Sequence, residues 1–217
     1  VNIIRLKENT LSETLAADAY QAAINFGHQP LYFDAINKDN VLEFIENNRI
    51  KFSKDKKIKS TLGTLGCFAS HYSLWNLISQ KKKPEVIVEH DGIIIRDFKN
   101  IVKDVEDVCH VDPFDPYSRT YWDDIKQNKE LCIEDYQRAK EKKKKFTGGY
   151  FRGAYGYILT PQGARKLLRF IKENGCFTAD RCICENALIL KQTSITCVRL
   201  HDFFDSARKI KENSTRD

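Results

Sequence analysis

Glu85-Val86-Ile87-Val88-Glu89-His90-Asp91 is the stretch that decides the fold, because an uninterrupted apolar run is followed at once by polar, ligand-bearing side chains. A strand with one face in water alternates apolar and polar residues, whereas a strand covered on both faces reads as continuously apolar. The run is therefore predicted to be a central strand of a sheet with both faces covered. Gly92 then marks a turn, and Ile93-Ile94-Ile95 resumes β character.

The beginning of the chain predicts a β-α-β unit, which is the building block of a parallel sheet. Residues 2–6 and 30–35 are short β-prone runs, and apolar residues recur at helical spacing between them. Thr10 and Glu13 resemble a capping box at the start of that helix. Gly27 is expected to end it.

The rest of the chain continues the alternation of helices and strands, so the fold class is α/β with a mostly parallel sheet. Residues 112–149 show no clear period and are expected to form a variable, acceptor-facing segment within one domain over 1–205, followed by a polar tail over 206–217. The other predicted elements are a short helix capped by Asp39 and running to Ile45, a helix after Gly63 and Gly66 that reaches Ile78, a helix over 100–108, a strand over 154–160, a helix over 161–175, a helix over 179–191 and a strand over 194–198.

Length and composition favour one globular domain. Of 217 residues, 41% are hydrophobic and 30% are charged, so a sizeable core is possible and disorder is disfavoured. A membrane helix needs about 20 apolar residues, and no such run occurs. Seven cysteines are an odd number, which favours reduced, mostly buried thiols in a cytosolic compartment. Cys182 and Cys184 flanking a metal is the alternative interpretation.

The net charge is +6, and many of the lysines lie in three short groups. Such groups are common in solvated loops and helix ends, and they also attract anionic partners such as phosphorylated glycolipid or nucleic acid. We expect the protein to be cytoplasmic, and its lysines could bind it to the inner membrane surface. The groups are Lys54, Lys56, Lys57 and Lys59; Lys81–Lys83; and Lys142–Lys145.

Glu89, His90 and Asp91 place three potential metal ligands at the carboxyl end of the central strand, where open α/β sheets bind their ligands. Side chains alternate along a strand, so Glu89 and Asp91 can point the same way and hold a hard divalent cation. The alternative is that polar residues simply end a strand. The sequence lacks a P-loop, a G-x-G-x-x-G after the first strand and a G-x-S-x-G, which argues against P-loop nucleotidases, nicotinamide-dependent dehydrogenases and common serine hydrolases.

Three further residues have both a structural and a functional interpretation. His71 lies on an apolar helix, where a buried structural histidine is as natural as a ligand. His201 follows the last strand, as part of either a metal or phosphate contact or a surface polar pair with Asp202. Asp180 begins a predicted helix, so it can be a cap, a catalytic base, or both.

Two blocks of sequence match known patterns in order. Gly66-Cys67-Phe68-Ala69-Ser70-His71 is similar to G-C-x-x-S-H, and residues 156–164 are similar to G-Y-x-L-(T/S)-x-x-G-A. Together with weaker landmarks over roughly residues 2–200, the chain resembles glycosyltransferase family 25, which includes lipooligosaccharide and collagen galactosyltransferases. The weaker landmarks are Ile3-Ile4-Arg5-Leu6, Phe33-Asp34-Ala35, Val86–Asp91 and Asp180. Of these, Val86–Asp91 resembles the family's apolar strand followed by E-D-D.

The resemblance implies an A-type glycosyltransferase fold, a single Rossmann-like domain that binds a UDP-sugar with the help of Mn²⁺ or Mg²⁺. Asp91 would be the principal metal ligand, with support from Glu89. His201 would correspond to a histidine ligand near the end of many A-type enzymes, by its position in the chain and not by a motif. His90 stands where the family usually has aspartate, which removes one negative charge. The residues assigned to donor binding are Ile4, Leu6, Asp34, Ala35, Ser70, His71, Glu89 and His90.

The resemblance also implies an inverting transfer of a galactose-like hexose to a hydroxyl of a glycan or glycolipid. A carboxylate would take the proton of that hydroxyl. Asp180 is the first choice for this base and Glu185 the second.

Two other functions remain open at this point. The same chemistry could act on a hydroxylated nucleic-acid base, which would have to leave its stack. A non-catalytic relative that only binds a nucleotide sugar is the second alternative, suggested by His90.

Overall fold

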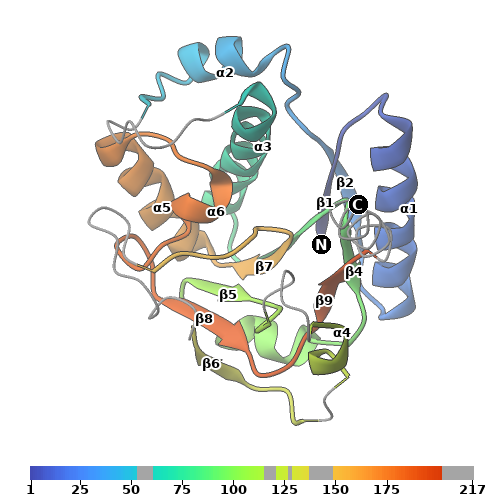
Figure 1. The fold of residues 1–217 in the computed structure, drawn as a ribbon. Helices are drawn as coiled ribbons and strands as arrows, with labels where there is room; N and C mark the ends of the chain where they lie inside the picture. The colour runs from blue at the N-terminus through green and yellow to red at the C-terminus, as the bar shows by residue number, and fades with distance from the viewer. Residues whose placement is uncertain (53–60, 115–120, 127–128, 137–148, 202–217) are drawn as a thin grey trace, which may run out of the picture.

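The computed structural model describes residues 1–52, 61–114, 121–126, 129–136 and 149–201. Its centre is a seven-stranded sheet in the order β2-β1-β3-β7-β5-β8-β6 (Figure 1). The strands β2, β1, β3, β5 and β8 run in one direction, whereas β7 and β6 run against them, which confirms an α/β fold with a mostly parallel sheet. The strands are β1 (Asn2–Arg5), β2 (Leu31–Asp34), β3 (Glu85–Glu89), β5 (Val108–His110), β6 (Ile133–Asp135), β7 (Gly156–Leu159) and β8 (Leu190–Thr193).

Helices cover both faces of this sheet, with α1 on one side and α3 and α5 on the other (Figure 1). A separate antiparallel pair of β4 (Gly92–Ile94) and β9 (Val198–Leu200) packs beside α1. The helices are α1 (Thr10–Asn25), α2 (Val41–Asn47), α3 (Leu62–Ser79), the 3₁₀ helix η1 (Lys99–Asp104), α4 (Tyr121–Asp124), α5 (Pro161–Asn174) and α6 (Ala179–Cys182).

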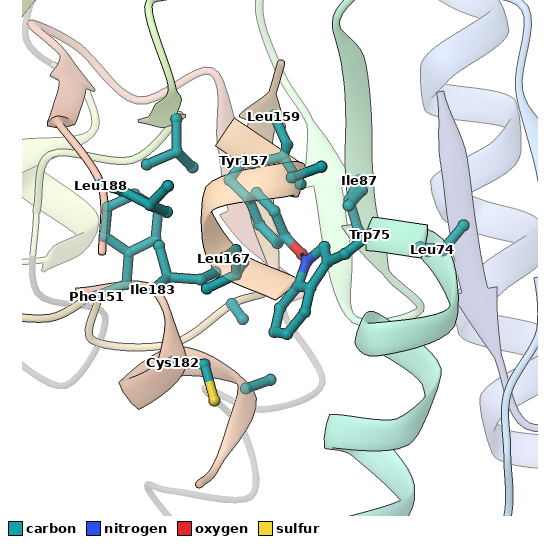
Figure 2. Packing of buried hydrophobic residues seen from close by; sticks show 14 of the residues in the cluster. Leu74, Trp75, Ile87, Phe151, Tyr157, Leu159, Leu167, Cys182, Ile183 and Leu188 are labelled. Carbon is teal, nitrogen blue, oxygen red and sulfur yellow. Dashed lines mark hydrogen bonds between the residues drawn. The ribbon is translucent and has the colours of Figure 1, made fainter. Parts of the chain in front are cut away.

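The apolar run of β3 is explained by burial on both faces. Ile87 packs into the cluster formed with α3 and α5, part of which Figure 2 shows. Val86 and Val88 point to the opposite face and pack with residues of α1, η1, β4 and β9. In β1, Ile4 and Ile3 divide between the two faces in the same way. The prediction of a central strand covered on both faces is therefore confirmed.

The β-α-β unit is confirmed, with β1 and β2 paired in parallel, but its helix is capped differently from the prediction. Asn9, not Thr10, is the N-cap, and its side chain accepts a hydrogen bond from the Ser12 N–H at 2.9 Å. Glu13 accepts from the Glu8 N–H at 3.2 Å, so it contributes to the cap without Thr10. Gly27, at a φ of 69°, ends the helix as expected.

The next two helices begin at other residues than predicted. Asn40, not Asp39, precedes α2, and the backbone N–H groups of both residues donate to the Asn37 side chain in the turn before the helix. Helix α3 begins at Leu62 and contains both Gly63 and Gly66, which the sequence placed before it. Its cap is Thr61, whose hydroxyl accepts from the backbone N–H of the third residue of α3 at 3.2 Å.

Three later predictions are wrong in part or in whole, and long-range pairing is the reason. The predicted helix over 100–108 is a 3₁₀ turn, and its last residue belongs to β5, which pairs with β7 and β8. The predicted helix over 179–191 is the single turn α6 followed by β8. The strand expected over 194–198 is displaced to β9, because the chain leaves the large sheet there to pair with β4.

The expected acceptor-facing segment, residues 112–149, contributes β6 to the edge of the sheet and the short helix α4, neither of which the sequence predicted. The rest of it and the expected tail over 206–217 lie largely or wholly outside the described residues. No helix in the described ranges is long and apolar enough to cross a membrane. All seven cysteines are unpaired and most are buried, in agreement with the interpretation as thiols.

The block over 156–164 is explained by the way α5 begins. Thr160 is the N-cap of α5: its hydroxyl accepts from the Gly163 N–H at 3.0 Å and donates to the Glu106 carbonyl at 2.9 Å. The Thr160 N–H donates to the Asp107 carbonyl at 3.0 Å. A Cβ on Gly163 would press into that same Asp107 backbone, so only glycine allows the approach.

Gly163→Ala is therefore expected to destabilise the protein by about 1–3 kcal/mol, the usual cost of forcing extra volume into a packed region. Thermal unfolding measures the change. Gly63→Ala is the matched control in a helix first turn, because its added Cβ would lie 3.8 Å from the Thr61 hydroxyl, an ordinary contact. Equal melting temperatures for the two variants would contradict the account.

Candidate active site

A cavity of about 360 Å³ lies at the carboxyl ends of β1, β2 and β3 and against α3. We call it the strand-end cavity. This is the edge where the sequence predicted a site, although the prediction named only the end of β3. Seven of the eight residues assigned to donor binding line this cavity: Ile4, Leu6, Ala35, Ser70, His71, Glu89 and His90.

Asp34 is the assigned residue that the structure does not bring to this cavity. Its carboxylate accepts a hydrogen bond from Arg5 Nε at 2.9 Å, and both side chains remain partly in solvent. The Arg5 guanidinium lies 4.2 Å from the centre of the Tyr32 ring, which holds this pair on the outer side of β1 and β2.

Polar residues that the sequence analysis did not single out also line the strand-end cavity. Lys7 follows β1, whereas Asn37 and Lys38 follow β2. The signal that could have found them is the same strand-end rule that pointed to Glu89, applied to the two neighbouring parallel strands.

Ser70 holds one wall of the cavity in place. Its hydroxyl accepts from the Ile36 N–H at 2.9 Å and donates to the Gly66 carbonyl at 2.7 Å, so both of its hydrogen-bonding roles link the loop after β2 to α3. A Cβ on Gly66 would lie 2.7 Å from the Ile36 carbonyl oxygen. The glycine and the serine of G-C-x-x-S-H therefore set how closely this loop packs on the helix.

A second cavity, of about 450 Å³, contains Asp180 and Thr178 and is called the Asp180 cavity. Gly63, Cys67 and Glu89 line both cavities, so the two meet along α3 and the end of β3. We call this shared boundary the junction.

Asp180 combines burial with a defined orientation. One carboxylate oxygen accepts hydrogen bonds from the Thr178 hydroxyl and from the Arg181 N–H. Burial raises the pKa of Asp180 above its ordinary value, although these hydrogen bonds and the Arg181 charge work against the rise. Glu185, the second candidate base, is exposed and lines neither cavity.

Glu89 is held by α3. His71 Nε2 lies 2.8 Å from Glu89 Oε1, and the Cys67 thiol donates to the same oxygen at 3.6 Å. Burial alone would raise the pKa of Glu89, but the hydrogen bond from His71 and the neighbouring imidazoles, including His90, lower it below its ordinary value. Glu89 is therefore a charged carboxylate at the junction.

Asp91 has the chemistry of an unsatisfied metal ligand. Its Oδ1 is buried and, among the described residues, has no hydrogen-bond partner. Burial and the charge of Glu89 raise the pKa of Asp91 to about 7. A buried carboxylate oxygen without a partner, next to the charged Glu89, fits a divalent cation, which would favour the charged form of Asp91.

The other possible ligands lie differently. His201 contacts the Asp91 carbonyl through its backbone N–H at 2.7 Å, while its Nε2 hydrogen-bonds Asp18 at 2.9 Å. Its role as a ligand therefore remains a prediction. Ligand atoms of Cys67, His71 and Glu89 lie within 4.8 Å of one another, the one such group of three found among the described residues. Neither Cys182 nor Cys184 belongs to it.

Of the three lysine groups, only Lys81–Lys83 lies among the described residues. Residues 54–59 and 142–145 lie outside the described residues. In the group Lys81–Lys83, Lys81 Nζ lies 2.6 Å from Glu85 Oε1, at the opposite end of β3 from the cavities.

Ser70→Ala is expected to lower stability by about 1–3 kcal/mol, because it leaves the Ile36 N–H without its partner. Ser73→Ala is the matched control on the same helix: its hydroxyl only donates to the Ala69 carbonyl, at 2.9 Å. Chemical denaturation of both variants measures the difference. A Ser70→Ala protein as stable as the Ser73→Ala protein would show that the loop does not depend on this link.

Comparison with known sequences finds relatives that are all named as glycosyltransferases. Three insect proteins named "Glycosyltransferase 25 family member" are similar. The Drosophila melanogaster protein is 28% identical over a match that covers 50% of this chain and 17% of the relative. The Aedes aegypti protein is 32% identical over a match that covers 50% of this chain and 17% of the relative. A Haemophilus influenzae protein named "Putative glycosyltransferase" is 25% identical over 78% of this chain and 59% of its own. The matches thus span less than two thirds of each relative's length, and less than a fifth of the length of the insect proteins.

Two solved glycosyltransferases show a distant structural likeness. Mouse xyloside xylosyltransferase 1 in its apo form has a TM-score of 0.40 at 9% identity, over 84% of this chain and 79% of its own. Galactosyltransferase LgtC, in complex with donor and acceptor sugar analogues, has a TM-score of 0.39 at 12% identity, over 91% and 72%. Both scores are low, so neither structure bears on the site.

The sequence model of glycosyltransferase family 25 (LPS biosynthesis protein) matches residues 3–183, which include β1, α3, β3, the block at β7 and α5, and Asp180. The chain therefore belongs to glycosyltransferase family 25.

Proposed function

We propose that this protein transfers a galactose-like hexose from a UDP-sugar to a hydroxyl of a glycan or glycolipid. The donor occupies the strand-end cavity and the acceptor occupies the Asp180 cavity. The observation that carries this proposal is the junction, where Gly63, Cys67 and Glu89 line both cavities at once. Group transfer needs two substrates whose reacting atoms meet, and two cavities with a common wall provide that arrangement.

The strand-end cavity has the side chains that a nucleoside diphosphate sugar requires. Apolar residues of β1 and of the loop after β2, such as Ile4 and Ile36, offer a surface for the base and ribose. Lys7 and Lys38 bring positive charge to the same cavity, which suits a diphosphate. The sugar would then lie toward Glu89.

The residues at the end of β3 fit a divalent cation, and Mn²⁺ or Mg²⁺ is the proposed one. Asp91, whose buried Oδ1 has no partner among the described residues, would hold it, with Glu89 as the second carboxylate. Such a cation, when bound, stabilises the negative charge that the diphosphate develops as it leaves.

Asp180 is proposed to act as the general base. The acceptor oxygen forms a bond to the anomeric carbon while the bond from that carbon to the diphosphate breaks on the opposite side, which inverts the configuration. The hydroxyl proton passes to the Asp180 carboxylate, and the nucleoside diphosphate leaves with the bonding electrons. The Thr178 and Arg181 contacts hold one carboxylate oxygen in place, so the other can face the acceptor.

The acceptor class rests on the family. Its description as an LPS biosynthesis protein supports a lipid-linked glycan, which would place the reaction at the inner membrane surface. Since the matches span only part of the relatives' lengths, acceptor and location are proposals for the whole protein.

Asp180→Asn is expected to lower kcat for transfer by about 100-fold or more, because a general base contributes 10²–10⁴-fold, while donor affinity stays unchanged. Release of UDP in the presence of a glycan acceptor measures the rate. Glu185→Gln is the control, since Glu185 lies outside both cavities, and should retain full activity.

The raised pKa of Asp180 also sets the sign of the pH dependence. Below that pKa the carboxyl is protonated and cannot accept the proton, so activity should fall on the acid side at a pH above the ordinary aspartate range of about 4.

Full transfer activity of the Asp180→Asn variant would show that Asp180 is not the base.

Asp91→Ala is expected to abolish the enhancement of donor binding by manganese, because it removes the buried carboxylate whose Oδ1 has no partner among the described residues. Calorimetric titration with a UDP-sugar, with and without Mn²⁺, measures the effect. Asp97→Ala is the control: this exposed carboxylate pairs with Lys99 at 3.3 Å and is absent from both cavities. Unchanged donor affinity in the presence of Mn²⁺ would refute the metal role of Asp91.

A further inference from the structure

Four buried or half-buried polar side chains form a continuous hydrogen-bonded chain behind the junction. Trp75 Nε1 donates to Tyr157 Oη at 2.8 Å, and Figure 2 shows these two atoms pointing at each other. Tyr157 Oη lies 2.8 Å from His71 Nδ1, and His71 Nε2 lies 2.8 Å from Glu89 Oε1. Trp75, Tyr157 and His71 are each 0% exposed, so water cannot replace any partner.

The directions of these hydrogen bonds follow from which atoms carry hydrogen. An indole nitrogen only donates, so Tyr157 Oη must accept from Trp75. Burial raises the pKa of Tyr157 well above its ordinary value, so the phenol keeps its own hydrogen. That hydrogen points to His71 Nδ1, the other atom within hydrogen-bonding distance of Oη.

His71 is thereby fixed in one tautomer. Its Nδ1 accepts from Tyr157, so the ring hydrogen resides on Nε2 and is donated to Glu89 Oε1. A hydrogen on Nδ1, in either the other tautomer or the imidazolium, would leave the Tyr157 hydroxyl hydrogen buried without this acceptor, which is unfavourable.

With its hydrogen on Nε2, His71 orients Glu89 by donating to one carboxylate oxygen. Both donors to Glu89 among the described residues, His71 and the Cys67 thiol, go to Oε1. The second oxygen, Oε2, is left for a ligand at the junction. The carboxylate is thus oriented from behind while Oε2 remains available in front.

We propose that Trp75 and Tyr157 are positioning residues that act through His71: they fix its Nε2–H tautomer so that the Glu89 carboxylate is held in one orientation at the junction of the two cavities. The role of Glu89 toward the sugar donor or its cation rests on the proposed function. The tautomer of His71 does not, so the two can be tested separately.

The first experiment measures the His71 tautomer by ¹⁵N NMR of the histidine side chains in the wild-type protein without ligand. The chain has five histidines, and the signals missing from His71→Gln identify the pair that belongs to His71. The expected result is a ring whose hydrogen lies on Nε2 and whose Nδ1 is an acceptor. A hydrogen on Nδ1 would overturn the proposal.

The second experiment compares Tyr157→Phe with Tyr155→Phe. Both remove a buried phenol hydroxyl, but that of Tyr155 donates to Asp112 and does not touch His71. Tyr157→Phe should lose the fixed tautomer, with hydrogen appearing on Nδ1, whereas Tyr155→Phe should leave the His71 signals unchanged. Unchanged His71 signals in Tyr157→Phe would overturn the proposal.

Activity gives a third readout. Hydrogen-bond partners of a metal ligand typically contribute 10–100-fold. Tyr157 acts on Glu89 through its partner His71, so Tyr157→Phe should lower kcat by about 10-fold relative to Tyr155→Phe at a similar melting temperature. Equal kcat values would overturn the catalytic part of the proposal. If the wild type transfers no sugar, the proposed function fails while the tautomer result stands. If Tyr157→Phe does not fold, the tautomer measured in the wild-type protein still decides.

Discussion

Burial of β3 on both faces is the constraint on which the rest of the structure depends. Ile87 packs against α3 and α5, while Val86 and Val88 pack into the opposite layer. A shift of one residue would exchange the two faces and break both sets of contacts. Because the strand is fixed in this way, its carboxyl end is fixed too, and Glu89 comes to lie where two cavities and α3 converge.

The residues of the two sequence blocks typical of the family have mainly structural roles. Gly66 and Ser70 bring the loop after β2 onto α3, and Thr160 and Gly163 bring the start of α5 onto the backbone before β5. The first pair shapes a wall of the strand-end cavity, whereas the second fixes α5 against the sheet away from both cavities. His71 differs from them, because one of its nitrogens reaches a carboxylate at the junction.

Continuous apolar strands and strongly periodic helices were predictable, since their patterns record local burial. The stretch from Ala187 to Leu190 was not, because four apolar residues fit a helix and a buried strand equally well, and only pairing with β5 decides. Most donor-side residues could be placed from strand ends and family blocks. The link between His71 and Tyr157 could not, because it joins residues 86 positions apart. The junction likewise depends on how α3, β3 and α6 pack together.

The central claim is that the strand-end cavity binds a nucleotide sugar. Calorimetric titration of the wild-type protein with a panel of UDP- and GDP-sugars, each with and without Mn²⁺, tests it most directly. The account predicts binding of one UDP-hexose, strengthened by Mn²⁺, in agreement with carboxylates at the end of β3 that fit a cation. Failure of every nucleotide sugar to bind, with or without Mn²⁺, would contradict it.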